Sequence, residues 1–156
     1  MVGPGRRVSR TARPAGAPYS WHDHVEPDGE RVAENELDAC LQTGCTTQSD
    51  YDMCIEEVAA RKRRAVAGQL GPPEDATPVR TQPLLWEIRW DFQGRPLRLY
   101  HAEPRRAPAM LLALLCHWKR TSGRTAQIEA AQDGQMSEAA ARYGRSAFHP
   151  GRGESD

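Results

Sequence analysis

Four cations and a histidine in the second half of the chain are the residues best suited to chemistry on a phosphate. Arg89 and Arg98 stand on two segments whose residues alternate like strands. Lys119 and Arg120 belong to a basic exit that begins at His117. Arginine suits phosphate because its planar guanidinium donates paired hydrogen bonds and keeps its charge, whereas lysine among cations and histidine near neutrality can exchange protons. Outward arginines also occur on solvated strand faces, so this pattern alone permits either interpretation.

The positions of these cations depend on a predicted three-stranded sheet. The residues of the first strand alternate between its two sides. One side carries Leu84, Trp86, Ile88 and Trp90, and the other carries Leu85, Glu87, Arg89 and Asp91. The third strand is nearly all apolar, as is typical of a central strand buried on both faces. If the sheet is curled, the four cations share one concave surface. The predicted strands cover residues 84–91, 97–101 and 110–116, with a turn at Gly94 between the first two.

Helical periodicity flanks the sheet on both sides. Residues 31–41 and 50–67 carry apolar side chains at near-helical spacing, and residues 122–143 form a shallower, alanine-rich helix. A short segment at 19–25 could form a leading strand. The order predicts an α+β domain with two N-terminal helices, a small curled antiparallel sheet and a C-terminal helix, the helices lying on one face.

Composition divides the chain into one domain and two tails. Residues 1–18 are rich in Gly, Pro and Arg and are predicted to be a disordered basic tail, 19–143 a single domain, and 144–156 a second disordered tail. The net charge is +4 over residues 1–20, −10 over 21–60 and +6 over 61–156. A basic second half could meet a polyanion, although such charges also serve solubility alone.

No metal, cofactor or membrane segment is predicted. The four cysteines, at positions 40, 45, 54 and 116, form no CxxC pair and are expected to be reduced thiols in a cytoplasmic protein. His22 and His24 lack evident further ligands and are expected to be surface histidines. No apolar run approaches the roughly 20 residues that span a bilayer, and the N-terminus lacks the apolar core of a secretory signal.

The central stretch also resembles a known family. Its segments in order are Leu85-Trp86-Glu87-Ile88-Arg89, Gly94, Arg98-Leu99-Tyr100, the apolar run 110–116 and Lys119-Arg120-Thr121. Their order and spacing resemble the RelE/HigB-like toxins of type II toxin–antitoxin systems, in the phage-derived branch. The resemblance covers residues 84–121, about a quarter of the chain, and the RelE-like fold it implies has two N-terminal helices before a curled antiparallel sheet.

The resemblance implies an endoribonuclease that inhibits translation. Such toxins cleave mRNA at the ribosome through attack of a 2′-OH group, and a cognate helix-turn-helix antitoxin inhibits them. On this interpretation Arg89 and Arg98 hold the scissile phosphate, and Arg120 stabilises the transition state or assists the leaving group. Lys119 is the expected general base, with His117 as its competitor. Tyr100, or alternatively Tyr143, would stack on a base, and further RNA contacts are assigned to Arg95 and Arg124.

Two other interpretations stay open. The chain could be a non-enzymatic relic of the same fold that binds a partner protein through its sheet. It could also be an accessory protein that binds nucleic acid on the same basic face without cleaving it.

Overall fold

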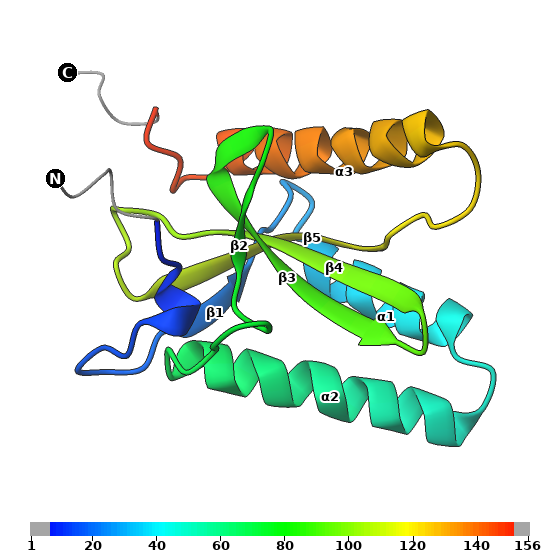
Figure 1. Ribbon diagram of the computed structural model, residues 1–156. Helices are drawn as coiled ribbons and strands as arrows, with labels where there is room; N and C mark the ends of the chain where they lie inside the picture. Colours follow the sequence, from blue (N-terminus) through cyan, green and yellow to red (C-terminus); the bar gives the residue numbers. More distant parts are fainter. Residues whose placement is uncertain (1–6, 152–156) are drawn as a thin grey trace, which may run out of the picture.

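A five-stranded mixed sheet, with strand order β1-β5-β4-β3-β2, runs through the centre of the computed structural model, which describes residues 7–151 (Figure 1). β1 pairs with β5 in parallel, and the other neighbours pair antiparallel. The strands are β1 (Ser20–Asp23), β2 (Thr77–Val79), β3 (Gln82–Phe92), β4 (Arg95–Ala102) and β5 (Met110–Trp118), and the helices are α1 (Val32–Gly44), α2 (Gln48–Val66) and α3 (Thr125–Arg145), with a short 3-10 turn at Arg10–Ala12.

This arrangement corrects the predicted fold class. The expectation of two N-terminal helices followed by a small antiparallel sheet is wrong, because β1 precedes α1 and the sheet is mixed and five-stranded. The chain leaves β1, forms α1 and α2 on one face of the sheet, and returns through β2, β3 and β4 to β5. β5 then lies beside β1 in the same direction, with Ser20 opposite Met110 and Asp23 opposite Ala113.

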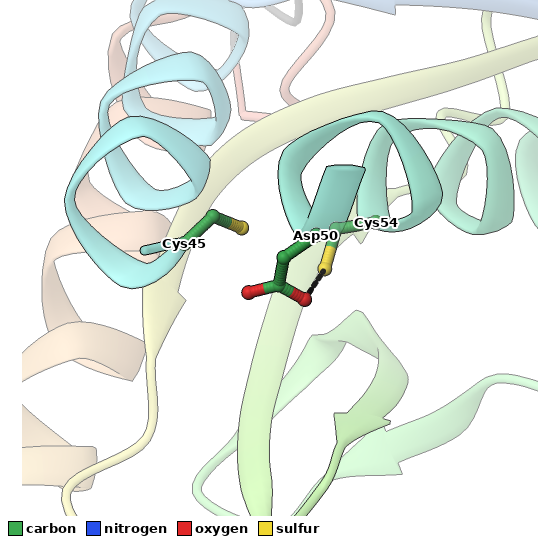
Figure 2. Close-up of side chains that lie close together, drawn as sticks. All are labelled: Cys45, Asp50 and Cys54. Atoms are coloured by element: carbon green, nitrogen blue, oxygen red, sulfur yellow. Dashed lines mark hydrogen bonds between the residues drawn. The ribbon is translucent and has the colours of Figure 1, made fainter. Parts of the chain in front are cut away.

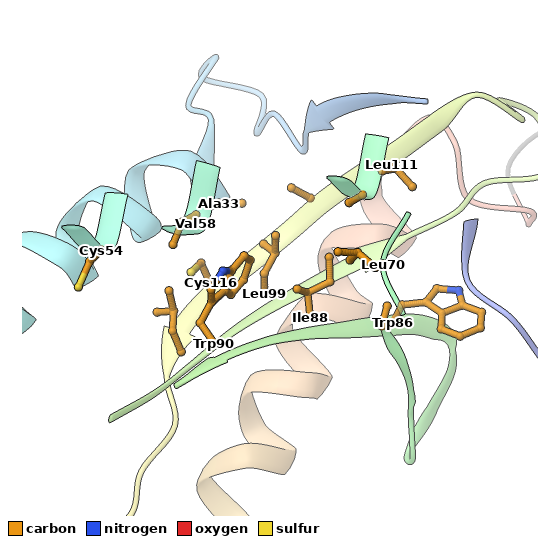
Figure 3. Packing of buried hydrophobic residues seen from close by; sticks show 14 of the residues in the cluster. Ala33, Cys54, Val58, Leu70, Trp86, Ile88, Trp90, Leu99, Leu111 and Cys116 are labelled. Atoms are coloured by element: carbon orange, nitrogen blue, oxygen red, sulfur yellow. The ribbon is translucent and has the colours of Figure 1, made fainter. Parts of the chain in front are cut away.

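Helices cover both faces of the sheet rather than one. α1 and α2 lie on one face and α3 crosses the other (Figure 1). The larger core lies under α1 and α2, where one buried cluster includes Trp86, Ile88 and Trp90 of β3 and Val58 of α2 (Figure 3). The predicted orientation of the two tryptophans and Ile88 is therefore confirmed, whereas Leu84, expected on the same face, is exposed. A second core joins Leu112 and Leu114 of β5 to residues of α3.

The β3–β4 hairpin sets the register of the central strands. Its turn places Gln93 at φ 57° and Gly94 at φ 81°, and the Asp91 carboxylate accepts a hydrogen bond of 2.7 Å from the Gly94 N–H. Two consecutive left-handed residues match the twist of a two-residue hairpin. The resulting register places Arg89 opposite Arg98 and Glu87 opposite Tyr100.

The segments next to the chain ends make ordered contacts. Residues 9–11, inside the segment expected to be disordered, are buried, and the Arg10 guanidinium donates hydrogen bonds to the backbone carbonyls of Pro104, Ala107 and Met110. Ser146 is also buried and follows α3 directly. The remainder of the expected tails, 1–6 and 152–156, lies outside the described residues. No helix within residues 7–151 is long and apolar enough to cross a membrane.

Candidate functional site

A group of polar side chains lies on the α3 face of the three central strands, opposite the tryptophan core. Its members stand at neighbouring positions, because β3 pairs Arg89 with Arg98 of β4, and β4 pairs Arg98 with His117 of β5. Most of them are buried, which is unusual for charged groups. We call this set the polar cluster, and it comprises Glu87, Arg89, Arg98, Tyr100 and His117.

One carboxylate serves both arginines of the cluster. The buried Glu87 Oε1 lies 2.8 Å from Arg98 Nε and 3.1 Å from Arg89 Nε. The Arg98 Nε–H is not aimed at that oxygen, so this contact is a charge pair rather than a directed hydrogen bond. Burial lowers the pKa of Arg98, and the Glu87 charge offsets part of this effect. The pair of arginines therefore keeps one net positive charge on this face.

The two arginines differ in access to solvent. The Arg98 side chain is 11% exposed and its Nη1 donates to the Leu97 carbonyl, whereas the Arg89 side chain is 57% exposed. Sequence reasoning treated them as equivalent phosphate ligands because both face away from the tryptophans. In the structure only Arg89 presents its guanidinium directly to an incoming anion.

Tyr100 and His117 form a hydrogen-bonded pair with a defined tautomer. His117 Nδ1 lies 3.0 Å from the Trp118 carbonyl, and Nε2 lies 3.1 Å from the Tyr100 hydroxyl. A carbonyl only accepts, so Nδ1 carries the proton and Nε2 accepts from the tyrosine. Burial is the main cause that lowers the pKa of His117 to about 4, with the charges of Arg98 and Lys119 acting in the same direction. The imidazole is therefore neutral at physiological pH.

Tyr100 does not offer a surface for stacking. It is completely buried, and the Gln132 side chain of α3 hydrogen-bonds its hydroxyl. Burial, followed by the nearby Glu87 charge, raises the pKa of Tyr100 to about 12. In this conformation the tyrosine is a hydrogen-bond donor to His117 and presents no open ring to a base. Tyr143, the alternative stacking residue, is buried as well, in the core beneath α3.

The remaining predicted cations fall into two groups. Lys119 and Arg120 follow β5 directly beyond His117, and the charge of Lys119 contributes to the lowered pKa of His117. Arg120 donates a hydrogen bond to the Ser122 carbonyl, and Arg124 is the residue before α3. Arg95 lies on the opposite face of β4. Its guanidinium stands 5.3 Å from the centre of the Trp118 ring and 3.4 Å from the Asp50 carboxylate, so the structure does not bring it to the cluster.

Helix α3 covers the cluster unequally. Its fully buried residues are Met136, Ala139, Arg142 and Tyr143, all on the C-terminal side of Gly134. On the N-terminal side of Gly134 no residue is fully buried. The half that lies over Tyr100 is therefore held to the sheet by few apolar contacts, which is the usual property of segments that open.

Sequence reasoning missed two features of this face. It did not foresee that the Glu87 carboxylate would pair with both arginines. The sequence contained the signal for this pairing, because alternation along two antiparallel strands places Glu87, Arg89 and Arg98 on the same face. The second feature is the cover by α3, which no periodicity in residues 84–121 reveals.

Histidines 22 and 24 do not form a paired surface site. His22 is exposed, whereas His24 is buried, and its Nε2 lies 3.3 Å from Glu26 Oε1. The expectation that both are surface histidines therefore holds for His22 alone.

Comparison with known proteins found no relative of this chain. No protein-family model matches the chain, and neither a curated protein nor a solved structure matches it.

Proposed function

We propose that this chain is the toxin of a toxin–antitoxin pair and acts in the cytoplasm as a metal-independent endoribonuclease on ribosome-bound mRNA. The observation that carries the proposal is the polar cluster, in which the neutral imidazole of His117 lies beside Arg98, and Arg89 stands opposite Arg98 on the next strand. The RelE/HigB-like motifs of residues 84–121 supply the residues of that cluster. Lys119, Arg120 and Arg124 extend it into a basic border that suits a phosphate backbone.

Cleavage by this cluster divides the work among a base, cations and an acid. His117 Nε2 takes the proton of the ribose 2′-OH after that hydroxyl replaces Tyr100 as its donor. The 2′-oxygen attacks the phosphorus, the bond to the 5′-oxygen breaks, and a cyclic phosphate and a 5′-hydroxyl result. Arg89 and Arg120 stabilise the charge on the phosphate. Lys119 protonates the leaving oxygen and is therefore the general acid. The general base, a role expected of Lys119 from the sequence, is His117.

Access to the cluster requires movement of α3. Arg98 and Tyr100 are buried, and Gln132 closes over the tyrosine hydroxyl. Displacement of residues 125–133 would remove Gln132 from the Tyr100 hydroxyl and open the way to His117, while the C-terminal half of α3 stays packed on the sheet. A helix-turn-helix antitoxin that holds this segment down would keep the enzyme inactive, which gives the partner a physical role.

Expression of the chain alone tests the proposal. Growth should stop after induction, and translated messages should acquire new 5′-hydroxyl ends. Arg89→Ala is the matched control, because its exposed side chain contributes little to folding. If the wild-type chain leaves growth and messages intact at the same expression level, the enzymatic proposal is wrong.

The second candidate is a non-enzymatic module that binds RNA or a partner protein. The observation in its favour is the pairing of Arg98 with Glu87 beneath α3, which stabilises the fold without any reaction. RNA retention on the purified protein without cleavage would favour RNA binding. If the purified protein neither retains nor cleaves RNA, binding of a partner protein is the candidate that remains.

A further inference from the structure

Two cysteines and an aspartate converge at the corner between α1 and α2. Cys45 is the residue that caps the C-terminus of α1, while Asp50 and Cys54 lie one turn apart near the start of α2. Figure 2 shows the three side chains directed toward one another. Their donor atoms all lie within 4.8 Å of one another, the one such convergence of three His, Cys, Asp or Glu side chains within residues 7–151.

We propose that Cys45, Asp50 and Cys54 bind a zinc ion, a site that lies outside the polar cluster and outside the proposed function. Thiolate sulfur selects thiophilic ions such as Zn²⁺ over Mg²⁺ or Ca²⁺. A carboxylate oxygen is the third protein ligand, and water completes the tetrahedral shell that Zn²⁺ takes with three protein ligands.

The separations of the donor atoms suit that ion. Tetrahedral bonds of about 2.3 Å to sulfur and about 2.1 Å to oxygen imply ligand separations of about 3.8 Å between sulfurs and about 3.6 Å between sulfur and oxygen. Cys54 Sγ lies 3.9 Å from Asp50 Oδ1. The remaining contraction, from at most 4.8 Å, needs only small side-chain rotations.

Charge around the site is arranged for a divalent ion. Asp50 turns Oδ1 toward Cys54 and Oδ2 toward Arg95, whose Nη2 lies 3.4 Å away. Arg95 is itself placed by the Trp118 ring beneath its guanidinium. An outer partner of this kind orients a carboxylate ligand. With zinc bound, the two thiolates and the carboxylate are neutralised by the ion and Arg95 together.

The backbone at the corner fixes the ligands in advance. The Cys45 N–H donates to the Leu41 carbonyl at 3.1 Å, and the Asp50 N–H donates to Thr47 Oγ1 at 3.1 Å. A surface cavity of about 490 Å³, lined by Cys45, Thr47 and Tyr51 among others, borders the site. The cavity reaches the site at Cys45, whereas Asp50 and Cys54 do not line it.

The other two cysteines provide an internal comparison. Cys40 and Cys116 are also neighbours, since Cys40 Sγ lies 4.0 Å from the Cys116 carbonyl oxygen. Within residues 7–151 that pair has no third ligand group converging on it as Asp50 does on Cys45 and Cys54. All four cysteines are free thiols. Replacement of Cys40 therefore removes a thiol of similar exposure without touching the proposed ligands.

Cobalt titration of the reduced, tag-free full chain tests the site. Co²⁺ should bind one ion per chain with a thiolate-to-cobalt charge-transfer absorption, and Zn²⁺ should displace it. Cys45→Ser should abolish that absorption, Asp50→Asn should weaken binding several-fold, and Cys40→Ser should bind as the wild type does. Zn²⁺ should also raise the melting temperature of the wild type and of Cys40→Ser, but not that of Cys45→Ser.

Three results would overturn the proposal: no charge-transfer absorption in the wild type, the same absorption in Cys45→Ser, or its loss in Cys40→Ser. Circular dichroism of each variant checks that the helices are intact. Cys45 is the residue to replace first, because it is half-buried whereas Cys54 is fully buried.

Discussion

Arg142 of α3 donates two hydrogen bonds to the Glu36 carboxylate of α1, from Nη1 to Oε1 at 2.7 Å and from Nη2 to Oε2 at 3.1 Å. The pair also closes the outer edge of β5, which β1 covers only as far as Ala113. Glu36 accepts a hydrogen bond from the Cys116 N–H, and Arg142 donates one to the Leu114 carbonyl. One ion pair thus ties together helices on opposite faces and satisfies a strand edge that would otherwise be open.

Removal of Arg142 should therefore be costly. Arg142→Ala leaves the Glu36 carboxylate and the Leu114 carbonyl without their partner, so we expect a loss of about 3 kcal/mol in the free energy of unfolding. Arg145→Ala is the control, since its ion pairs with Glu26 and Glu138 are exposed and should contribute less than about 1 kcal/mol. Urea denaturation measures both, and equal losses would show that the edge contact is unimportant.

The two cluster arginines should separate stability from activity. Arg98→Ala removes a buried partner of Glu87 and should cost about 2 kcal/mol or more of folding free energy. Arg89→Ala, at an exposed position, should cost less than about 1 kcal/mol. On the proposed function Arg89→Ala loses RNA cleavage although it stays folded, because Arg89 contacts the phosphate. Thermal melting beside a cleavage assay checks this, and a stable Arg98→Ala protein would contradict the described pairing.

The lowered pKa of His117 predicts a loss of stability in acid. The folded state keeps the imidazole neutral down to about pH 4, whereas the unfolded chain protonates it near the ordinary value of 6.5. The unfolded state therefore binds more protons as pH falls from about 6.5 to about 4, and stability declines over that window. Above about pH 6.5 His117 makes its full contribution to the free energy of unfolding. It amounts to roughly 2–3 kcal/mol after allowance for the partial exposure of the ring.

His117→Asn is the matched variant for this test, because it removes the titrating group and keeps a polar side chain. Its free energy of unfolding should vary less with pH between about 6.5 and about 4 than that of the wild type. Parallel pH dependences for the two proteins would show that His117 titrates normally.

Gly134 should control the opening of α3. It lies inside the helix, and a Cβ there would meet no atom within 4 Å. Gly134→Ala should therefore raise the free energy of unfolding by up to about 1 kcal/mol through helix propensity. If residues 125–133 swing away to admit RNA, the same change should slow cleavage.

Gly144→Ala is the control for that hinge, since Gly144 is also helical and open to a Cβ but lies beyond the packed half of α3. It should leave cleavage unchanged. Single-turnover cleavage rates of the two variants distinguish the cases, and equal rates would place the opening motion elsewhere.

Local patterns predicted the central elements well. Strict alternation located the strand containing Trp86 and Trp90, whose buried face is the one expected, and the apolar run of β5 identified a strand covered on both sides. Gly94 marked the hairpin turn. These features follow from neighbours in sequence, so periodicity is enough to find them.

Features that depend on distant partners escaped prediction. The four residues of β1 carry too little pattern to show that they pair parallel with β5, and that pairing makes the sheet mixed. The cover over the Tyr100 hydroxyl comes from Gln132 of α3, a helix with a weak apolar stripe. The convergence of Cys45 with Cys54 was hidden because eight residues lie between them and only the α1–α2 corner brings them together.

Parallel pairing of β1 with β5 also has a consequence during synthesis on the ribosome. The helices α1 and α2 and the strands β2, β3 and β4 are all made between β1 and its partner β5, which is the last strand to emerge. Until β5 is available, α1 and α2 have no complete sheet to cover, and the tryptophan face of β3 is left exposed. Because β5 also carries His117, a nascent chain has no assembled polar cluster. Folding of the sheet and completion of the cluster are therefore a single late event.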